Sequence, residues 1–387
     1  MDLTRPAWLE IDLDNLHFNY KEIRKLVRDT ADIMAVVKAD AYGHGAAAIV
    51  RELMDLGVKR FGVAHLSEAI HIKNHSPHAQ VLVMGYTPDY LAENAIEWGV
   101  RLTVYLEEQA EHFAKVAKSL NKDAVIHLKI ETGMNRLGFL PDENTLKAVE
   151  RIKEMDNVII EGMFTHFPAA DDDHEYTERS MSKFRSFCRM LYERNIDIPV
   201  KHVSNSAAIM NFPQFGLDMV RAGIILYGIY PYPEAKRETL PLKPCISLKA
   251  QISHVKTIEE GEKVSYGLTF EANSRTQVAT VPVGYADGWS RDLSNKGIAL
   301  VNGKRVPIIG KICMDQLMLD VTGMDVKRGD EAVLMGSQGG EQITIEEIAD
   351  QIGQIPASVL CMLTKRLPRV YVKERRVPEV VDYLLEI

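Results

Sequence analysis

The chain has 387 residues, of which 46% are hydrophobic and 26% charged, the composition of an ordinary globular protein. At about 100–200 residues per domain, this length predicts two or three domains. The net charge of −8 argues against nucleic acid as a partner, and no apolar run reaches the roughly 18–20 residues that a membrane span needs. The N-terminal residues do not resemble a secretory signal, and the four cysteines lack a Cys-x-x-Cys spacing. We therefore expect a soluble, cytoplasmic, multi-domain enzyme without a metal site.

The first 240 residues alternate short β-branched runs with helix-like segments. The runs are IMAVV (33–37), RFGVAH (60–65), QVLVMG (80–85), RLTVY (101–105), AVIHLKI (124–130), VIIEGMFTH (158–166), VKHVSN (200–205) and DMVRAG (218–223). Eight buried strands separated by helices predict a (β/α)8 barrel of the TIM-like type. An open, doubly wound sheet is the main alternative for this pattern.

Beyond residue 240 the runs lie closer together, and Gly, Asn and Asp occupy the turns between them, which predicts a mainly β domain. Thr344 and Glu347 have the spacing of a capping box for one short helix over 345–353. The proline-rich segment 230–244 is the predicted linker. We accordingly divide the chain into a barrel, residues 1–240, and a C-terminal β domain, residues 241–387. Residues 1–13 include the strand-like WLEIDL and are alternatively assigned to the β domain.

Polar residues follow six of the eight runs, where barrel enzymes carry their chemistry. Lys38 follows the first run directly, and a lysine at the edge of a buried region becomes nucleophilic when burial lowers its pKa. An ordinary surface lysine is the alternative. The segments SNSAA (204–208) and RAGI (221–224) follow the last two runs and are typical of an anion-binding nest, although SNSA is also typical of a helix N-cap. A lysine on the first strand and a nest on the last two indicate a barrel that holds pyridoxal phosphate, with Arg221 facing its pyridine nitrogen.

Eight segments of the sequence resemble those of bacterial alanine racemases, in order and over nearly the whole chain. They are AVVKADAYGHG (35–45), IETGMNRLG (130–138), THF (165–167), SNSAA (204–208), MVRAGIILYG (219–228), VSYGLTF (264–270), VPVGYADGW (281–289) and GKICMDQ (310–316). The resemblance implies a homodimer that uses pyridoxal phosphate to interconvert L- and D-alanine. It also implies that the product D-alanine supplies peptidoglycan synthesis.

The resemblance implies two catalytic bases. Lys38 matches the lysine that carries pyridoxal phosphate, and Tyr266, supplied by the other subunit, matches the second base. Two opposed groups are needed because a single rigid base would return the proton to the face from which it came. Arg221 matches the residue at the pyridine nitrogen, where an arginine restrains side reactions because it does not exchange protons readily at neutral pH.

The remaining residues implied by the resemblance are three groups and one single lysine. The expected cofactor contacts, besides Lys38 and Arg221, are Tyr42, Arg136, His166, Asn205, Ser206, Gly223 and Ile224. The expected substrate contacts are Arg136 together with Met314, Asp315 and Tyr285, of which Met314 and Asp315 come from the partner subunit. A substrate access corridor is expected to contain Asp171, His202, Tyr285 and Arg291. Lys129 matches a lysine that is often carbamylated and orients Arg136.

Two positions depart from the pattern of the family. Ala357 stands where a tyrosine usually narrows the substrate pocket, and Lys311 stands where an arginine is common. The missing phenol predicts a racemase that tolerates serine or larger amino acids, and a non-catalytic homologue that binds pyridoxal phosphate is a further alternative. A decarboxylase of the same architecture is disfavoured because it would carry an acidic residue at the position of Arg221.

Overall fold

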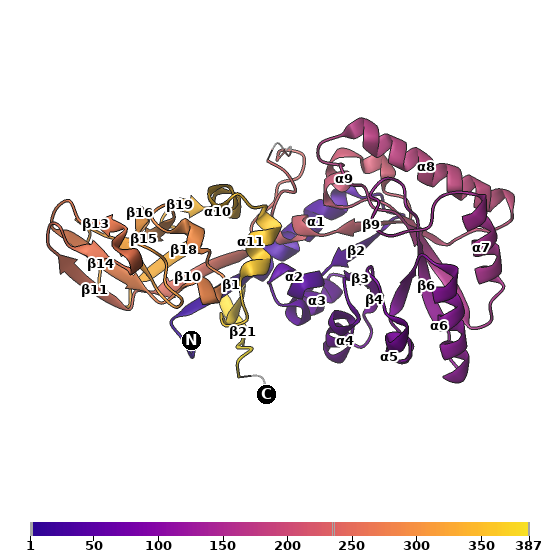
Figure 1. Ribbon diagram of the computed structural model, residues 1–387, viewed down its shortest axis with the longest axis horizontal. Coiled ribbons are helices and arrows are strands. Elements are labelled where there is room, and N and C mark those ends of the chain that lie inside the picture. The colour runs from indigo at the N-terminus through magenta and orange to yellow at the C-terminus, as the bar shows by residue number, and fades with distance from the viewer. Residues whose placement is uncertain (1–2, 234, 236, 386–387) are drawn as a thin grey trace. The chain divides into compact units, whose positions relative to one another are not determined.

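The computed structural model describes residues 3–233, 235 and 237–385. Its contacts group the chain into two compact units, which Figure 1 shows. The barrel unit comprises His17–Ala41 and Gly45–Lys243. The β unit comprises the residues up to Leu16, the short segment Tyr42–His44, and the chain from Pro244 onward.

Eight parallel strands close into a barrel, in which the last strand pairs with the first. They are β2 (Asp32–Val36), β3 (Arg60–Val63), β4 (Gln80–Val83), β5 (Arg101–Val104), β6 (Ala124–Lys129), β7 (Val158–Phe164), β8 (Val200–His202) and β9 (Met219–Ala222). Each strand corresponds to one of the eight predicted runs. The predicted barrel is therefore confirmed, and the alternative of an open sheet is wrong.

Helices follow the strands of the barrel: α3 (Ala46–Asp55), α4 (Leu66–His75), α5 (Ala92–Glu97), α6 (Glu107–Ser119), α7 (Glu143–Lys153), α8 (His174–Glu193) and α9 (Ser206–Asn211). Local sequence explains where they begin, as α7 illustrates. The Asp142 carboxylate accepts a hydrogen bond from the Thr145 N–H at 2.9 Å, which satisfies one free donor of the first turn. Leu146, Val149 and Ile152 recur every three residues and are all buried, so one face of this helix packs inward.

The β unit is built on one long sheet of strand order β11-β14-β17-β16-β15-β18-β10-β1-β20-β21. In chain order these are β1 (Ala7–Asp12), β10 (Ile246–Gln251), β11 (His254–Ile258), β14 (Thr276–Val281), β15 (Ile298–Val301), β16 (Lys304–Ile309), β17 (Leu317–Asp320), β18 (Glu331–Gln338), β20 (Arg369–Lys373) and β21 (Arg376–Val381). Strand β1 pairs antiparallel with β10 and parallel with β20, so the N-terminal strand is an inner strand of this sheet. Strands β10 and β11 are only two residues apart in the sequence but pair with different partners, β18 and β14.

Two short helices belong to the β unit, α10 (Ile345–Ile352) and α11 (Pro356–Met362), where the sequence predicted one. Thr344 caps α10 by accepting a hydrogen bond from the Glu347 N–H at 3.1 Å. The Glu347 side chain instead pairs with Arg305, so this contact replaces the second half of the predicted capping box. Within the described residues, no helix has the length and apolar character required to cross a bilayer.

Candidate active site

Lys38 lies just past the end of β2, at the carboxyl-end mouth of the barrel. The four residues after it, Ala39 to Tyr42, all have φ between 52° and 54°, so they form a left-handed turn. This conformation costs about 1–2 kcal/mol for each L-residue. Hydrogen bonds hold its first two residues: the Glu68 carboxylate accepts from the Ala39 N–H at 2.6 Å, and the Asp40 carboxylate accepts from the Ala46 N–H at 2.8 Å. Strain of this kind is typical of functional sites, and here it fixes the backbone beside Lys38.

Arg221 is the most deeply buried cation of the mouth, with 3% of its surface exposed. Its guanidinium donates to the carbonyls of Thr165, His202 and Val203 at 2.8–3.0 Å, and to ring nitrogens of His202 at 3.1 Å and His166 at 3.3 Å. Among the described residues, none of these hydrogen-bond partners is a carboxylate. Burial lowers the pKa of Arg221 to about 9, so the side chain still carries its charge at neutral pH. The guanidinium therefore presents a positive charge without a directly bonded anion.

The mouth of the barrel is strongly electropositive. Burial lowers the pKa of His166 well below its usual value, and four cations lower it further: Arg221, Arg136, Lys129 and Lys38. All four therefore lie close enough to act on this one imidazole, which is neutral as a result. Such a cluster of cations around a neutral ring is suited to binding an anionic ligand.

Lys129 ends β6 and is 4% exposed. Burial lowers its pKa to about 8, with Arg221 and Arg136 acting in the same direction and Glu131 against it. Its Nζ donates to the Ile130 carbonyl at 3.0 Å. A lysine with this pKa is partly neutral near pH 8, and only the neutral amine can form a carbamate.

Arg136 lies in a tight loop that folds back on the end of β6. Phe139 donates its N–H to the Lys129 carbonyl and accepts from the Glu131 N–H, both at 2.8 Å. The Glu131 carboxylate accepts from the N–H groups of Gly133 and Arg136. Burial raises the pKa of Glu131, but backbone hydrogen bonds outweigh it and leave the pKa below its usual value. An ionised Glu131 therefore holds the loop that carries Arg136.

The predicted nest lies at the ends of β8 and β9. Asn205 caps α9, because its side chain accepts from the Ala208 N–H at 2.9 Å, so the helix-cap interpretation of SNSA is correct for this residue. The Ser206 hydroxyl accepts from the Gly223 N–H at 3.1 Å and so joins the two segments. Ile224 begins a short 3₁₀ turn, in which the first N–H has no acceptor within the turn. Backbone donors and a hydroxyl are thus gathered at one place in the barrel unit.

Four other predicted residues gather on the β unit and expose their side chains: Tyr266, Tyr285, Met314 and Asp315. Backbone hydrogen bonds join their loops, since Tyr285 N–H donates to the Cys313 carbonyl at 3.1 Å and Ala286 N–H to the Met314 carbonyl at 3.0 Å. Gly284 permits this approach, because a Cβ there would lie 2.3 Å from the Cys313 carbonyl oxygen. The residue before Tyr266, Ser265, donates its hydroxyl to the Lys311 carbonyl. Tyr266 itself is 68% exposed.

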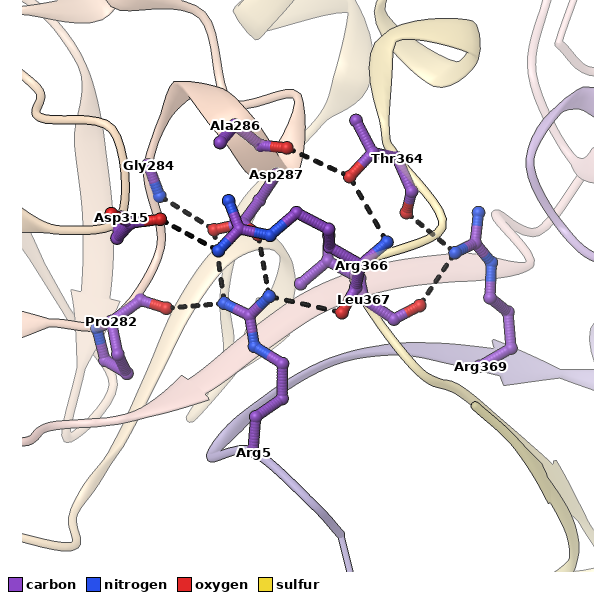
Figure 2. Close-up of polar contacts among 10 residues, drawn as sticks. All are labelled: Arg5, Pro282, Gly284, Ala286, Asp287, Asp315, Thr364, Arg366, Leu367 and Arg369. Atoms are coloured by element: carbon purple, nitrogen blue, oxygen red, sulfur yellow. Dashed lines mark hydrogen bonds and ion pairs between the residues drawn. The ribbon is translucent and has the colours of Figure 1, made fainter. Parts of the chain in front are cut away.

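A buried carboxylate, Asp287, anchors these loops, and Figure 2 shows the side chains of Arg5 and Arg366 converging on it. Arg5 donates to its two oxygens at 2.7 and 3.1 Å, and the Gly284 N–H donates at 3.0 Å. Arg366 lies with Nε 3.5 Å from Asp287 and donates through Nη2 to Asp315 at 2.8 Å. Arg366 thus links the exposed carboxylate of Asp315 to the buried carboxylate of Asp287.

Comparison with known proteins identifies the family. The sequence profile described as "Alanine racemase, N-terminal domain" matches residues 11–231, and that described as "Alanine racemase, C-terminal domain" matches residues 245–371. The chain belongs to the alanine racemase family. Members of this family are amino-acid isomerases, and the resemblance inferred from the eight segments is confirmed.

Individual alanine racemases match over their full length. The alanine racemase of Clostridium tetani is 44% identical over 383 residues, which are 98% of this chain and 99% of that one. The structure of the alanine racemase of Clostridium difficile 630 has a TM-score of 0.95 at 40% identity, covering 99% of this chain and 100% of that one. The histidine racemase of Leuconostoc mesenteroides subsp. sake has a TM-score of 0.88 at 28% identity, covering 96% and 99%. The fold therefore occurs in racemases with different named substrates.

One expectation drawn from the alanine racemase resemblance is wrong. His202 was expected in the access corridor, but it is completely buried and bonds to Arg221 within the barrel unit. Strand β8 has only three residues, and its last one points inward. Asp171 and Arg291 are exposed, and their corridor role stays a prediction, as does the role of Tyr42, which clusters with the β unit.

Sequence reasoning missed Asp287, Arg366 and Arg5. Asp287 lay inside a segment that resembles the alanine racemases, but nothing in its spacing indicated a buried ion pair. Its partners come from positions 5 and 366, at opposite ends of the chain. Such pairing becomes visible only when β1 is known to lie inside the sheet of the β unit.

Proposed function

We propose that this protein is a pyridoxal phosphate-dependent alanine racemase that acts as a homodimer by a two-base mechanism. The observation that carries the proposal is the barrel mouth, where four cations surround a neutral His166 next to a group of backbone donors. This donor set fits pyridoxal phosphate: an amine for its aldehyde, N–H and hydroxyl donors for its phosphate, and a guanidinium for its pyridine nitrogen. Lys38, Ser206 with Gly223 and Ile224, and Arg221 would hold it in these ways.

The cofactor, when bound to an amino acid, withdraws electrons from Cα and makes the Cα proton acidic. The residues of the protein then have to remove this proton from one face and return one to the other. Lys38 Nζ is the base on one face, and its backbone is fixed by the left-handed turn. Tyr266 of the partner subunit is the group on the other face, and the exposure of Tyr266 on the β unit supports this role.

Arg221 and Arg136 orient the reacting groups. Arg221 keeps its proton at neutral pH and can only donate, so it stabilises an unprotonated pyridine nitrogen and limits how far charge is drawn away from Cα. Arg136 would bind the substrate carboxylate, because it is an exposed guanidinium on a loop held by Glu131. The lowered pKa of Lys129 supports a carbamate at its Nζ, which would bring an anion to the side of Arg136.

The substrate would contact three residues of the partner subunit: Met314, Asp315 and Tyr285. Backbone hydrogen bonds join the loops of these residues on the β unit, and Tyr266 is exposed in the same unit. None of the four cysteines, all of which lie in the described part of the chain, takes part in a disulfide bond, which supports a reducing compartment, and we therefore place the reaction in the cytoplasm. There D-alanine would serve peptidoglycan synthesis.

Subunit complementation tests the proposal. Purified protein with pyridoxal phosphate should convert L-alanine to D-alanine, as measured by chiral chromatography, and Lys38→Ala and Tyr266→Phe should each abolish conversion. Mixing the two inactive variants under conditions that allow subunit exchange should restore activity, because one of the two sites in a mixed dimer would contain both bases. Tyr192→Phe is a matched control, since Tyr192 is another exposed tyrosine, on α8. The proposal would be contradicted if the wild-type protein did not convert alanine, or if mixing the two variants did not restore activity.

A second candidate is a racemase of broader specificity, and Ala357 favours it. Ala357 lies on α11, whose Leu360 carbonyl oxygen would be 2.9 Å from a Cβ at Gly43, next to the predicted cofactor contact Tyr42. The methyl group of Ala357 leaves space that the phenol of a tyrosine at this position would fill. The histidine racemase of the same fold supports the idea that this architecture can accept a large side chain.

A further inference from the structure

The amino end of the barrel contains a partly buried ionic cluster, in which the side chains of Glu161, Arg60 and Arg101 are 19–20% exposed. Glu161 on β7 lies 3.2 Å from Arg60 Nη1, and Arg101 approaches it at 3.3 Å through both Nε and Nη2. Arg60 and Arg101 are the first residues of β3 and β5, so the cluster lies at the end opposite the mouth. Strands β3, β5 and β7 are not neighbours in the barrel, and their side chains can therefore meet only in its interior.

A chain of hydrogen bonds leads from this cluster to the mouth. His127 Nε2 lies 2.9 Å from Glu161 Oε2, and His127 Nδ1 lies 2.9 Å from His202 Nε2. His202 Nδ1 in turn lies 3.1 Å from Nη1 of Arg221. Both histidines are at most 1% exposed. The chain thus joins a carboxylate at the bottom of the barrel to the guanidinium at its top.

The chemistry at the two ends fixes every proton in between. A guanidinium only donates, so Nδ1 of His202 must accept, and its proton must sit on Nε2. That proton is donated to Nδ1 of His127, which leaves the proton of His127 on Nε2, facing Glu161. An ionised carboxylate only accepts, so the chain is consistent at both ends.

The protonation states of the hydrogen-bonded residues agree with this assignment of protons. Burial lowers the pKa of both His127 and His202, so both rings are neutral at pH 7. Burial raises the pKa of Glu161, but the hydrogen bond from His127 and the charge of Arg101 outweigh it and bring the pKa to about 2. The carboxylate is therefore ionised throughout the neutral range.

Gly162 on β7 gives independent support for this hydrogen-bonded series, because the lack of a side chain there makes room for the ring of His127. A Cβ at this position would lie 2.3 Å from Nδ1 of His127. The ring of His127 thus crosses over β7 at Gly162 to reach His202 on β8. Phe164 stacks on the ring of His202 with centroids 4.8 Å apart and planes 7° apart, which holds the second ring in place.

We propose that Glu161 and His127 are positioning residues for the reaction, which set the tautomer of His202 and through it the orientation of the Arg221 guanidinium. The opposite tautomer of His202 would turn an N–H towards the N–H of Arg221 and break the chain. The arrangement also keeps the balancing anion three hydrogen bonds away from the guanidinium. Arg221 is thereby fixed without a directly bonded carboxylate, and its positive charge stays available to a ligand in the mouth. The catalytic part of this inference rests on the proposed function; the tautomer assignment does not.

Histidine tautomers in the holoenzyme test the proposal directly. Long-range ¹H–¹⁵N correlation spectra of protein labelled with ¹⁵N-histidine distinguish Nε2–H from Nδ1–H rings. We expect both rings to be neutral Nε2–H tautomers in the wild type. Glu161→Met removes the acceptor and should shift His127, and with it His202, towards a mixture of tautomers. Glu161→Gln keeps an acceptor oxygen and should restore the wild-type pattern. Asp32→Asn is the matched control, because it removes another carboxylate that pairs with Arg60, at 3.3 Å.

Kinetics on the same variants test the positioning role. Glu161→Met should lower kcat for alanine about tenfold, the scale on which outer hydrogen-bond partners of metal-bound histidines act, with KM changed much less. An Nδ1–H tautomer on either ring of the wild type would overturn the proposal, and this measurement needs no variant to fold. Unchanged tautomers in Glu161→Met, or altered tautomers with an unchanged kcat, would overturn it as well. A wild type with the expected tautomers but no activity on alanine would contradict the proposed function and leave the tautomer assignment intact.

Discussion

Replacing Asp287 with asparagine perturbs the most buried ion pair of the β unit. The substitution keeps the shape of the side chain but turns one acceptor oxygen into a donor. The partners of the carboxylate among the described residues are all donors: Arg5 at 2.7 and 3.1 Å, the Gly284 N–H at 3.0 Å, and Arg366 at 3.5 Å. The new amide N–H groups would therefore face at least one of these donors. Arg5 would keep its charge with its carboxylate partner gone.

The expected loss in the free energy of unfolding follows from the burial of the ion pair. Removing one partner of a buried ion pair costs about 3–5 kcal/mol. Asp287 is 0% exposed but the Arg5 side chain is 21% exposed, so water partly solvates the charge that is left. We therefore expect Asp287→Asn to lower the free energy of unfolding by about 3 kcal/mol, the low end of that range. Arg5→Met should have an effect of similar size, because it leaves the buried carboxylate with fewer donors.

A double-mutant cycle in urea measures the pair itself. Unfolding of the β unit can be followed by tryptophan fluorescence, since Trp8 and Trp289 are buried in this unit. If the contact is as close as the structure shows, the two substitutions should couple by about 1.5–3 kcal/mol. Effects that add to within about 0.5 kcal/mol would refute the reasoning, because residues that do not interact behave in this way.

Three further predictions concern single positions. Ala39→Gly should stabilise the protein by about 1 kcal/mol, because glycine adopts the left-handed conformation without strain, and should lower kcat by loosening Lys38; urea unfolding and racemisation assays check both. In buffer free of carbon dioxide, where its side chain is the unmodified amine, Lys129 has a folded-state pKa of about 8, below its unfolded value. The unfolded chain then binds more protons between about pH 8 and 10.5, so stability should rise with pH in that window. Lys129→Met should remove that rise and be more stable at pH 7 by about 3 kcal/mol, whereas an unchanged pH profile would show that the ammonium is well solvated. Ala357→Tyr should lower kcat/KM for serine more than for alanine; equal changes would mean that position 357 does not limit the substrate side chain.

The barrel could be predicted because each strand is buried on both faces and therefore appears as a short apolar run. Residues at the strand ends, such as Lys38 and Arg221, were found for the same reason, since barrel geometry brings all carboxyl ends of the strands to one mouth. The left-handed turn after Lys38 could not be predicted, because Ala39 and Ala41 have no local preference for positive φ.

Contacts made across the barrel interior or between distant segments also could not be predicted from the sequence. His202 lies at the end of β8, where a residue can point into the barrel or towards the mouth, and only the register of the closed sheet decides between them. Glu161 and His127 were read as part of ordinary strands because their partners lie on strands that are far apart in sequence. Asp287 depends on Arg5 in the same way. In each case the decisive interaction is a long-range pairing of charges or hydrogen bonds, which leaves no periodic pattern.

The central claim, a two-base racemisation of alanine, is tested most directly by following hydrogen exchange at Cα. The wild-type protein with pyridoxal phosphate is incubated with L-alanine in D₂O, and chiral chromatography with mass spectrometry measures deuterium in each enantiomer. The account predicts inversion, with deuterium in the D-alanine formed and, as the reaction reverses, in the L-alanine pool. Deuterium in L-alanine without any D-alanine would contradict it, because this result would show that only one face of Cα receives a proton.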